Sequence, residues 1–162
     1  MVETTNKIDM KHRIYTDTSV IGGCFDIEFE VYSNSLINEF KSGHKIITIS
    51  DLTLKELELA PEKVRNLLNE IPEANKEYIE LNDEAIFLSE KYLEEKAIHP
   101  NYIIDSQHIS MATINRNDVL VSWNFKHIVN LHRIHLYNSI NLKYGYPIIE
   151  IRSPREVIDD GE

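Results

Sequence analysis

Three acidic residues and one amide stand where the chain could place a divalent metal ion. Asp17 closes a short β-prone run, Glu56 lies on a helix entered directly after another such run, Asp105 opens a buried helical stretch, and Asn124 follows a short apolar strand. In an open parallel sheet, the functional crevice lies outside the carboxyl ends of the strands. Crowded carboxylates repel one another unless a cation arrives. Their joint placement therefore favours a metal site assembled by the fold.

Each acidic residue also has an ordinary structural interpretation. Asp17, followed by Thr18 and Ser19, is equally suited to capping a turn or a coming helix. Glu56 has charged neighbours that are typical of a solvated helix face, and Asp105 is a plausible helix N-cap. Only the combination of these positions at strand ends favours the functional interpretation.

Strands alternate with helices along the chain. The predicted strands are residues 13–17, 45–50, 77–81, 119–122 and 147–151. The predicted helices are 26–43, 51–59, 61–71, 82–93, 102–115 and 128–144, with Asp51 and Asn82 as expected N-caps and with a turn at Thr18-Ser19 and the Gly22-Gly23 pair. This order predicts an α/β domain with a mostly parallel sheet and helices on both of its faces.

Length and charge limit the class of protein. The 162 residues fit one domain, and 17 basic against 27 acidic residues give a net charge of −10. That balance disfavours a protein that coats nucleic acid, because neutralising phosphates requires clustered Lys and Arg. It does not disfavour a metallonuclease, in which the metal supplies the positive charge.

The ends and the apolar runs suggest an ordinary soluble protein. We expect a flexible leader at 1–11, a domain at 12–154 and an acidic tail at 155–162. Cys24 is the single cysteine, no secretory leader is recognisable, and no apolar run approaches the ~20 residues of a membrane helix. These features predict a cytoplasmic protein without a membrane segment.

Four segments together resemble the PIN-domain nucleases, which include the VapC-like ribonuclease toxins of type II toxin–antitoxin pairs. The segments are 14–20 (Ile-Tyr-Thr-Asp-Thr-Ser-Val), 49–57 (ending Leu-Lys-Glu-Leu), 105–112 (Asp-Ser-Gln-His-Ile-Ser-Met-Ala) and 120–127 (Leu-Val-Ser-Trp-Asn-Phe-Lys-His). They occur in the family's order, and the resemblance spans about residues 13 to 152.

The resemblance implies a three-layer α/β/α sandwich around a mostly parallel sheet of four to five strands. It also implies an acidic pocket that holds Mg²⁺ or Mn²⁺ and cleaves RNA, an antitoxin partner and a homodimer. Asp17, Glu56 and Asp105 match three acids of the family. Asn124 departs, since many members place a fourth acid there, although an amide carbonyl can still bind a hard cation.

We hypothesise that Asp17 and Asp105 hold the principal metal with help from Asn124, while Glu56 orients the attacking water. Substrate contacts are expected from Thr18, Ser19 and Lys126, each of which has a local structural role as its alternative. His108, one turn beyond Asp105, could pair with that carboxylate. A hydrogen-bonded core histidine is the preferred interpretation.

Two alternatives remain open. The first is a catalytically weakened PIN-like domain that acts as a nucleic-acid-binding or regulatory protein, with Asn124 as the sign of decay. The second is a purely structural partner domain. Mn²⁺ binding that requires Asp17 and Asp105 would exclude the structural domain, and RNA cleavage would then separate an active enzyme from a weakened one.

Overall fold

Five parallel strands form the centre of the structure, a computed structural model that describes residues 10–159. The strands are β1 (Arg13–Thr16), β2 (Ile46–Ser50), β3 (Lys76–Ile79), β4 (Val119–Val121) and β5 (Ile151–Arg152). Their order in the sheet is β3-β2-β1-β4-β5, and every neighbouring pair is parallel. The central strand β1 therefore lies between β2 and β4, which are far apart in sequence.

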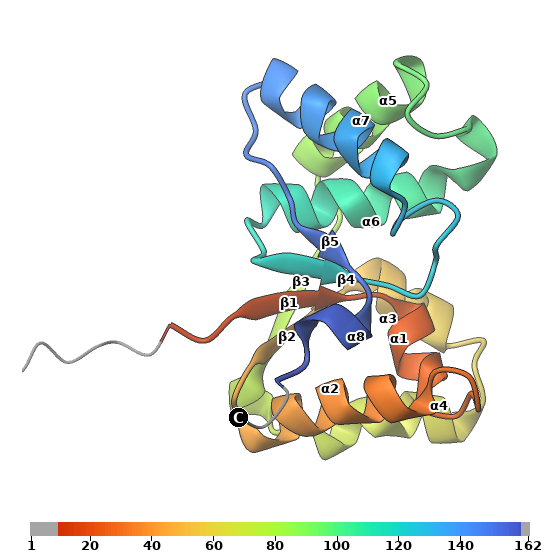
Figure 1. The fold of residues 1–162 in the computed structure, drawn as a ribbon, viewed down its shortest axis with the longest axis vertical. Helices are drawn as coiled ribbons and strands as arrows, with labels where there is room; N and C mark the ends of the chain where they lie inside the picture. The colour runs from red at the N-terminus through yellow and green to blue at the C-terminus, as the bar shows by residue number, and fades with distance from the viewer. Residues whose placement is uncertain (1–9, 160–162) are drawn as a thin grey trace, which may run out of the picture.

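Helices cover both faces of this sheet (Figure 1). The helices α5 (Asp83–Glu94), α6 (Ile103–Ile114) and α7 (Leu131–Lys143) lie on one face. The opposite face carries α1 (Thr18–Gly23), α2 (Glu30–Ser42), α4 (Glu62–Leu67) and α8 (Pro154–Val157). The helix α3 (Asp51–Leu57) follows β2, and short 3-10 turns occupy Leu68–Glu70, Glu73–Asn75 and Pro100–Tyr102. The expected three-layer α/β/α sandwich is confirmed.

Strand alternation divides the buried side chains into two cores. Ile14 and Val121 point into the core that contains Leu36 of α2, whereas Tyr15 and Leu120 point into the core with α5, α6 and α7. Successive side chains of a strand face opposite sides of the sheet, so neighbouring residues enter different cores. No helix within residues 10–159 is long and apolar enough to cross a membrane.

The segment after β1 differs from the expected turn, because residues 18–23 form α1. Asp17 caps this helix by accepting a hydrogen bond from Val20 N, and the glycines that suggest a loop are helical. The next helix, α2, begins at Glu30 instead of Asp26, since the Asp26 carbonyl closes turns with Phe29 N and Glu30 N.

Two further boundaries also differ from expectation. Ser50, not Asp51, caps α3, because Ser50 Oγ accepts the hydrogen bond of Thr53 N, and Asp51 instead accepts from Leu81 N at 3.2 Å. The last strand is shorter than 147–151. There the side chain of Asn138 bonds both Ile149 N (2.8 Å) and Ile149 O (3.1 Å), and so replaces part of the strand ladder.

The carboxyl-terminal segment is partly structured across the expected boundary at residue 155. Helix α8 spans Pro154–Val157, and Val157 and Ile158 pack against the core. Lys45 Nζ lies 3.2 Å from the carboxylate of Asp159. The expectation of a tail beginning at 155 is therefore wrong for residues 155–159, and the expected leader at 1–11 lies largely outside the described residues.

The two glycines of α1 provide a matched test of how this helix packs against α2 and against the segment after β4. A Cβ on Gly23 would lie 2.6 Å from Ser33 Oγ and 2.8 Å from Trp123 Nε1, two atoms that are hydrogen-bonded to each other. A Cβ on Gly22 meets nothing within 4 Å. We expect Gly23→Ala to lower the free energy of unfolding by about 1–3 kcal/mol, and Gly22→Ala to raise it by about 0.5 kcal/mol. Equal urea midpoints for the two variants would contradict this packing.

An ion pair at the opposite end of β1 predicts a pH dependence of stability. Arg13 Nε and Nη2 donate to the two carboxylate oxygens of Glu77 at 2.7 and 2.6 Å. These hydrogen bonds lower the pKa of Glu77 below its ordinary value of 4.5. The carboxylate of Glu77 therefore stabilises the fold above about pH 4.5. This stabilisation is lost as the pH falls through the pKa that Glu77 has in the folded protein.

Glu77→Gln is accordingly expected to lower the free energy of unfolding by about 1 kcal/mol at pH 7, since the pair is partly exposed. The difference from wild type should shrink below pH 4. Urea unfolding at pH 7, 5 and 3.5 measures it, and a difference that stays constant over this range would contradict the assignment.

Candidate metal-binding active site

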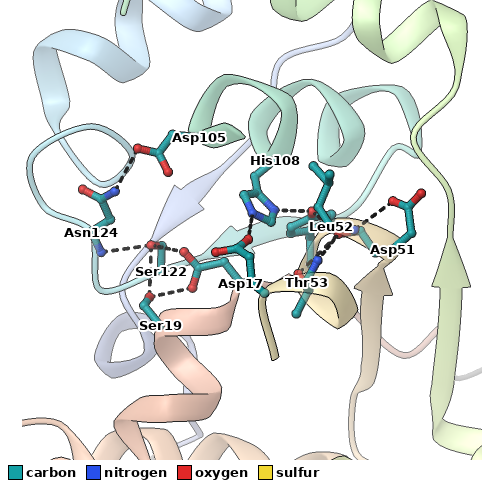
Figure 2. A network of polar contacts seen from close by, with 12 residues as sticks. Asp17, Ser19, Asp51, Leu52, Thr53, Asp105, His108, Ser122 and Asn124 are labelled. Carbon is teal, nitrogen blue, oxygen red and sulfur yellow. Dashed lines mark hydrogen bonds and ion pairs between the residues drawn. The ribbon is translucent and has the colours of Figure 1, made fainter. Parts of the chain in front are cut away.

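Parallel pairing brings the predicted site residues to one edge of the sheet. Asp17 follows β1, Glu56 lies on α3 after β2, and Asn124 lies just beyond β4. Because β1 pairs with both β2 and β4, the ends of these three strands are neighbours. Asp105 reaches the same edge from the first turn of α6. Figure 2 shows Asp17, Asp105 and Asn124 in this arrangement.

The carboxylate of Asp17 is buried and held by hydroxyl and backbone donors. Ser19 Oγ donates to Oδ1 at 2.6 Å, Val20 N donates to the same oxygen at 3.3 Å, and Ser122 Oγ donates to Oδ2. Its exposed fraction is 5%. Burial raises the pKa of Asp17 above its ordinary value, and these hydrogen bonds oppose the rise. A buried anion without a cation beside it is costly, and a divalent cation would offset that cost.

Asp105 is half-buried and faces the amide of Asn124. Burial raises the pKa of Asp105, the nearby imidazoles of His108 and His127 oppose this rise, and the charge of Glu56 adds to it. Asn124 Nδ2 donates to Asp105 Oδ2 over 3.4 Å, a long hydrogen bond. The carboxylate of Asp105 therefore lies near the acid Glu56 and near the imidazoles of His108 and His127, and it forms no ion pair with a Lys or Arg among residues 10–159.

The position of Asn124 corrects one expectation. Its Oδ1 accepts hydrogen bonds from Lys126 N at 3.2 Å and His127 N at 3.0 Å. The oxygen expected to bind metal thus closes a backbone turn, and only the nitrogen faces Asp105. A nitrogen that carries two hydrogens cannot ligate a cation, and in this arrangement the side chain of Asn124 donates to Asp105 while its oxygen is engaged in the turn.

Glu56 points toward His108, which the sequence suggested as a partner of Asp105. His108 Nε2 lies 2.6 Å from Glu56 Oε1, and His108 Nδ1 lies 2.6 Å from the hydroxyl of Tyr15. His108 is buried, as expected, whereas the side chain of Glu56 remains 43% exposed. The glutamate is therefore anchored at one oxygen and open to water.

The residues expected to contact substrate divide into two groups. The hydroxyl of Ser19 is engaged twice, since it donates to Asp17 and accepts from Trp123 N at 3.0 Å. Thr18 Oγ1 is buried without a hydrogen-bond partner, and Lys126 is exposed at the rim. Ser19 therefore orients Asp17, the hydroxyl of Thr18 is closed off from solvent, and only Lys126 is accessible to a ligand in this arrangement.

The donor set fits a hard cation that keeps part of its hydration. Within the described residues, no three His, Cys, Asp or Glu side chains form a ready-made set of metal ligands. Mg²⁺ is commonly bound through only one or two carboxylates, with water and phosphate filling the other positions. Asp17 and Asp105, whose pKa values are both raised by burial, are two carboxylates that would suit such an ion.

Comparison with known proteins finds similarity in the fold and not in the sequence. No protein-family model matches the chain, and no curated protein matches its sequence. Several solved structures do resemble it. A chain of VapBC2 from Rickettsia felis, bound to a promoter DNA fragment, aligns with a TM-score of 0.54 and 19% identity over 87% of this chain and 98% of that one.

Two more solved structures align with similar TM-scores and sequence identities. DNA-bound VapBC from Salmonella typhimurium aligns with a TM-score of 0.50 and 19% identity over 88% of this chain and 98% of that one. A toxin–antitoxin complex from Klebsiella pneumoniae gives 0.52 and 15% over 70% of this chain and 88% of that one. The protein therefore has a PIN-like, VapC-type fold, as its sequence motifs implied. At these identities the likeness is one of fold.

Proposed function

We propose that this protein is a metal-dependent endoribonuclease that hydrolyses RNA phosphodiester bonds with Mg²⁺ or Mn²⁺. The observation that carries the proposal is the placement of Asp17, directly after β1, and Asp105, in the first turn of α6, at the same end of a VapC-type sheet (Figure 2), where burial raises the pKa of both carboxylates. Such a pair is costly without a cation and suited to holding one beside a phosphate.

Each residue of the site has a distinct task in this mechanism. Asp17 and Asp105 would hold the ion, which when bound polarises a phosphoryl oxygen and lowers the pKa of water. Ser19 and Ser122 fix both oxygens of Asp17. Glu56, open to solvent on one side, orients the attacking water. Lys126, exposed just beyond β4, meets the RNA backbone as a point charge.

The biological role follows from the same fold. The structures from Rickettsia felis and Salmonella typhimurium contain VapB with VapC, and the Klebsiella pneumoniae structure is a toxin–antitoxin complex. We propose a toxin role for this chain, in the cytoplasm, as a homodimer with an antitoxin partner. Exposed apolar side chains at Ile27, Val31 and Leu59 provide apolar surface for such a protein partner.

RNA cleavage by the purified protein tests the proposal. Wild type and Asp17→Asn are compared in Mg²⁺, in Mn²⁺ and in EDTA. We expect cleavage by wild type that requires the metal and is lost in the variant. Equal cleavage by both proteins would assign the activity to a contaminant or to another site.

A catalytically weakened domain that binds nucleic acid is the second candidate. It is favoured by Asn124, which makes the site one charge poorer and offers its nitrogen to Asp105. In that case Mn²⁺ would still raise the melting temperature of wild type but not of Asp17→Asn, while RNA would be bound and left intact.

A further inference from the structure

A chain of buried hydrogen bonds leads from the sheet to Glu56. Tyr15 of β1 is fully buried, and its hydroxyl lies 2.8 Å from Ser50 Oγ and 2.6 Å from His108 Nδ1. His108 Nε2 in turn lies 2.6 Å from Glu56 Oε1. Figure 2 shows His108 on α6 above Asp17 and Thr53. The contacts connect β1, β2, α3 and α6 through one imidazole ring.

The same hydrogen-bond network also reaches the start of α3, the helix that carries Glu56. Ser50 Oγ accepts the hydrogen bond of Thr53 N at 3.1 Å and thereby caps α3. Glu56 lies in the last turn of the same helix. The start of α3 is therefore held through Ser50 and Tyr15, and Glu56 is held through His108 (3% exposed), so the ring fixes the carboxylate relative to β1.

Proton placement supports the same role. A carboxylate only accepts hydrogen bonds, so His108 Nε2–H donates to Glu56. Neutral His108 then accepts from the Tyr15 hydroxyl at Nδ1, whereas in the imidazolium Nδ1–H donates to Tyr15, which donates to Ser50. Both forms of the ring satisfy every partner. The hydrogen bond from Nε2–H to Glu56 is thus made both by the neutral ring that carries its proton on Nε2 and by the imidazolium.

A glutamate that is 43% exposed would otherwise sample several rotamers. Fixing such a side chain removes conformational freedom, so the contact that holds it must offset an entropic cost. We propose that His108 is a positioning residue of the nuclease reaction: it holds Glu56 in the orientation that directs the attacking water. This inference rests on the proposed function. The sequence predicted a hydrogen-bonded core histidine, and His108 is buried and hydrogen-bonded at both ring nitrogens; the positioning role goes further, because one of those bonds holds Glu56 and not Asp105.

Two substitutions of similar shape distinguish the hydrogen bond of Nε2 from that of Nδ1. In His108→Gln the amide nitrogen falls where Nε2 stood and still donates to Glu56, whereas in His108→Asn it falls where Nδ1 stood and reaches Tyr15 only. We expect His108→Gln to stay within about threefold of wild-type kcat. We expect His108→Asn to lose about tenfold to a hundredfold in kcat, with KM for RNA and the Mn²⁺ dependence unchanged.

If His108 were needed only for folding, the measurements would change in a different way. Both variants would then lose melting temperature and activity together, and this result would overturn the inference, as would wild-type kcat in His108→Asn. His132→Gln, which changes an exposed histidine of α7, is the control for loss of a histidine as such and is expected to match wild type.

A second measurement does not depend on activity. Crystal structures of the two variants should show Glu56 in one conformer in His108→Gln and in several conformers in His108→Asn. A single shared conformer would overturn the positioning role. Equal cleavage by wild type and Asp17→Asn would instead overturn the proposed function, so the two failures are distinguishable.

Discussion

An Asp17→Asn protein is expected to cleave RNA about a hundredfold to a thousandfold more slowly than wild type, and to unfold at the same or a higher temperature. A metal ligand contributes several kcal/mol to the stabilisation of charge in the transition state, and about 3–4 kcal/mol corresponds to this loss of rate. The amide keeps the shape of the side chain but removes its charge.

Stability is expected to survive because the hydrogen bonds around Asp17 can be remade. In the Asp17→Asn variant, the amide oxygen accepts from Ser19 and Val20 as the carboxylate does. The amide nitrogen then donates to the oxygen of Ser122, whose hydroxyl can turn toward Ser19 Oγ, 3.4 Å away. Burial raises the pKa of Asp17, so the charged form destabilises the metal-free fold at neutral pH, and the amide removes that cost.

Asp51→Asn supplies a control with the opposite expected pattern. Asp51 accepts hydrogen bonds from Leu52 N at 2.9 Å and from Leu81 N at 3.2 Å, and it has no task in the proposed reaction. Its substitution should lower the free energy of unfolding by about 1 kcal/mol and leave cleavage unchanged. Cleavage rates and melting temperatures of the three proteins measure both effects. A loss of stability in Asp17→Asn as large as its loss of activity would indicate a structural carboxylate instead.

Local signals were sufficient to predict much of the fold. The run of β-branched residues at 46–50 predicts β2, and Asn82 predicts the start of α5, where its side chain accepts from Ala85 N. Such signals involve residues within a few positions of each other. They failed at α1, where Gly22 and Gly23 suggest a loop, because the helix depends on packing of Gly23 against Trp123, which is distant in sequence.

In the candidate site, too, some residues could be predicted from local signals and others could not. Asp17 could be placed at the carboxyl end of β1 from the strand that precedes it, whereas Glu56 and Asp105 lie on α3 and α6 and their positions depend on where those helices start. Their partners were not predictable. Ser122 bonds Asp17 over 105 residues of sequence, and His108 bonds Glu56 over 52. These contacts depend on the order of the strands, in which β1 separates β2 from β4.

The position of Asn124 leads to a second large expected effect. In Asn124→Asp, one carboxylate oxygen can still accept from Lys126 N and His127 N, so the turn is retained. The other oxygen takes the place of the amide nitrogen that faces Asp105 Oδ2 at 3.4 Å. Two unit charges at about 4 Å repel by about 4 kcal/mol at an effective dielectric of 20, and the attraction of both carboxylates to a bound divalent ion would outweigh this repulsion.

We therefore expect Asn124→Asp to unfold at a lower temperature than wild type without metal, to bind Mn²⁺ at least about tenfold more tightly, and to gain more stability from it. Isothermal titration and thermal melts with and without Mn²⁺ measure these effects. Asn130→Asp is the matched control, because Asn130 also accepts a backbone hydrogen bond three residues ahead, from Arg133 N, where it caps α7. If both variants respond to Mn²⁺ as wild type does, then Asn124 does not border the metal. Tighter binding confined to Asn124→Asp would instead mean that the wild-type site lacks only this charge.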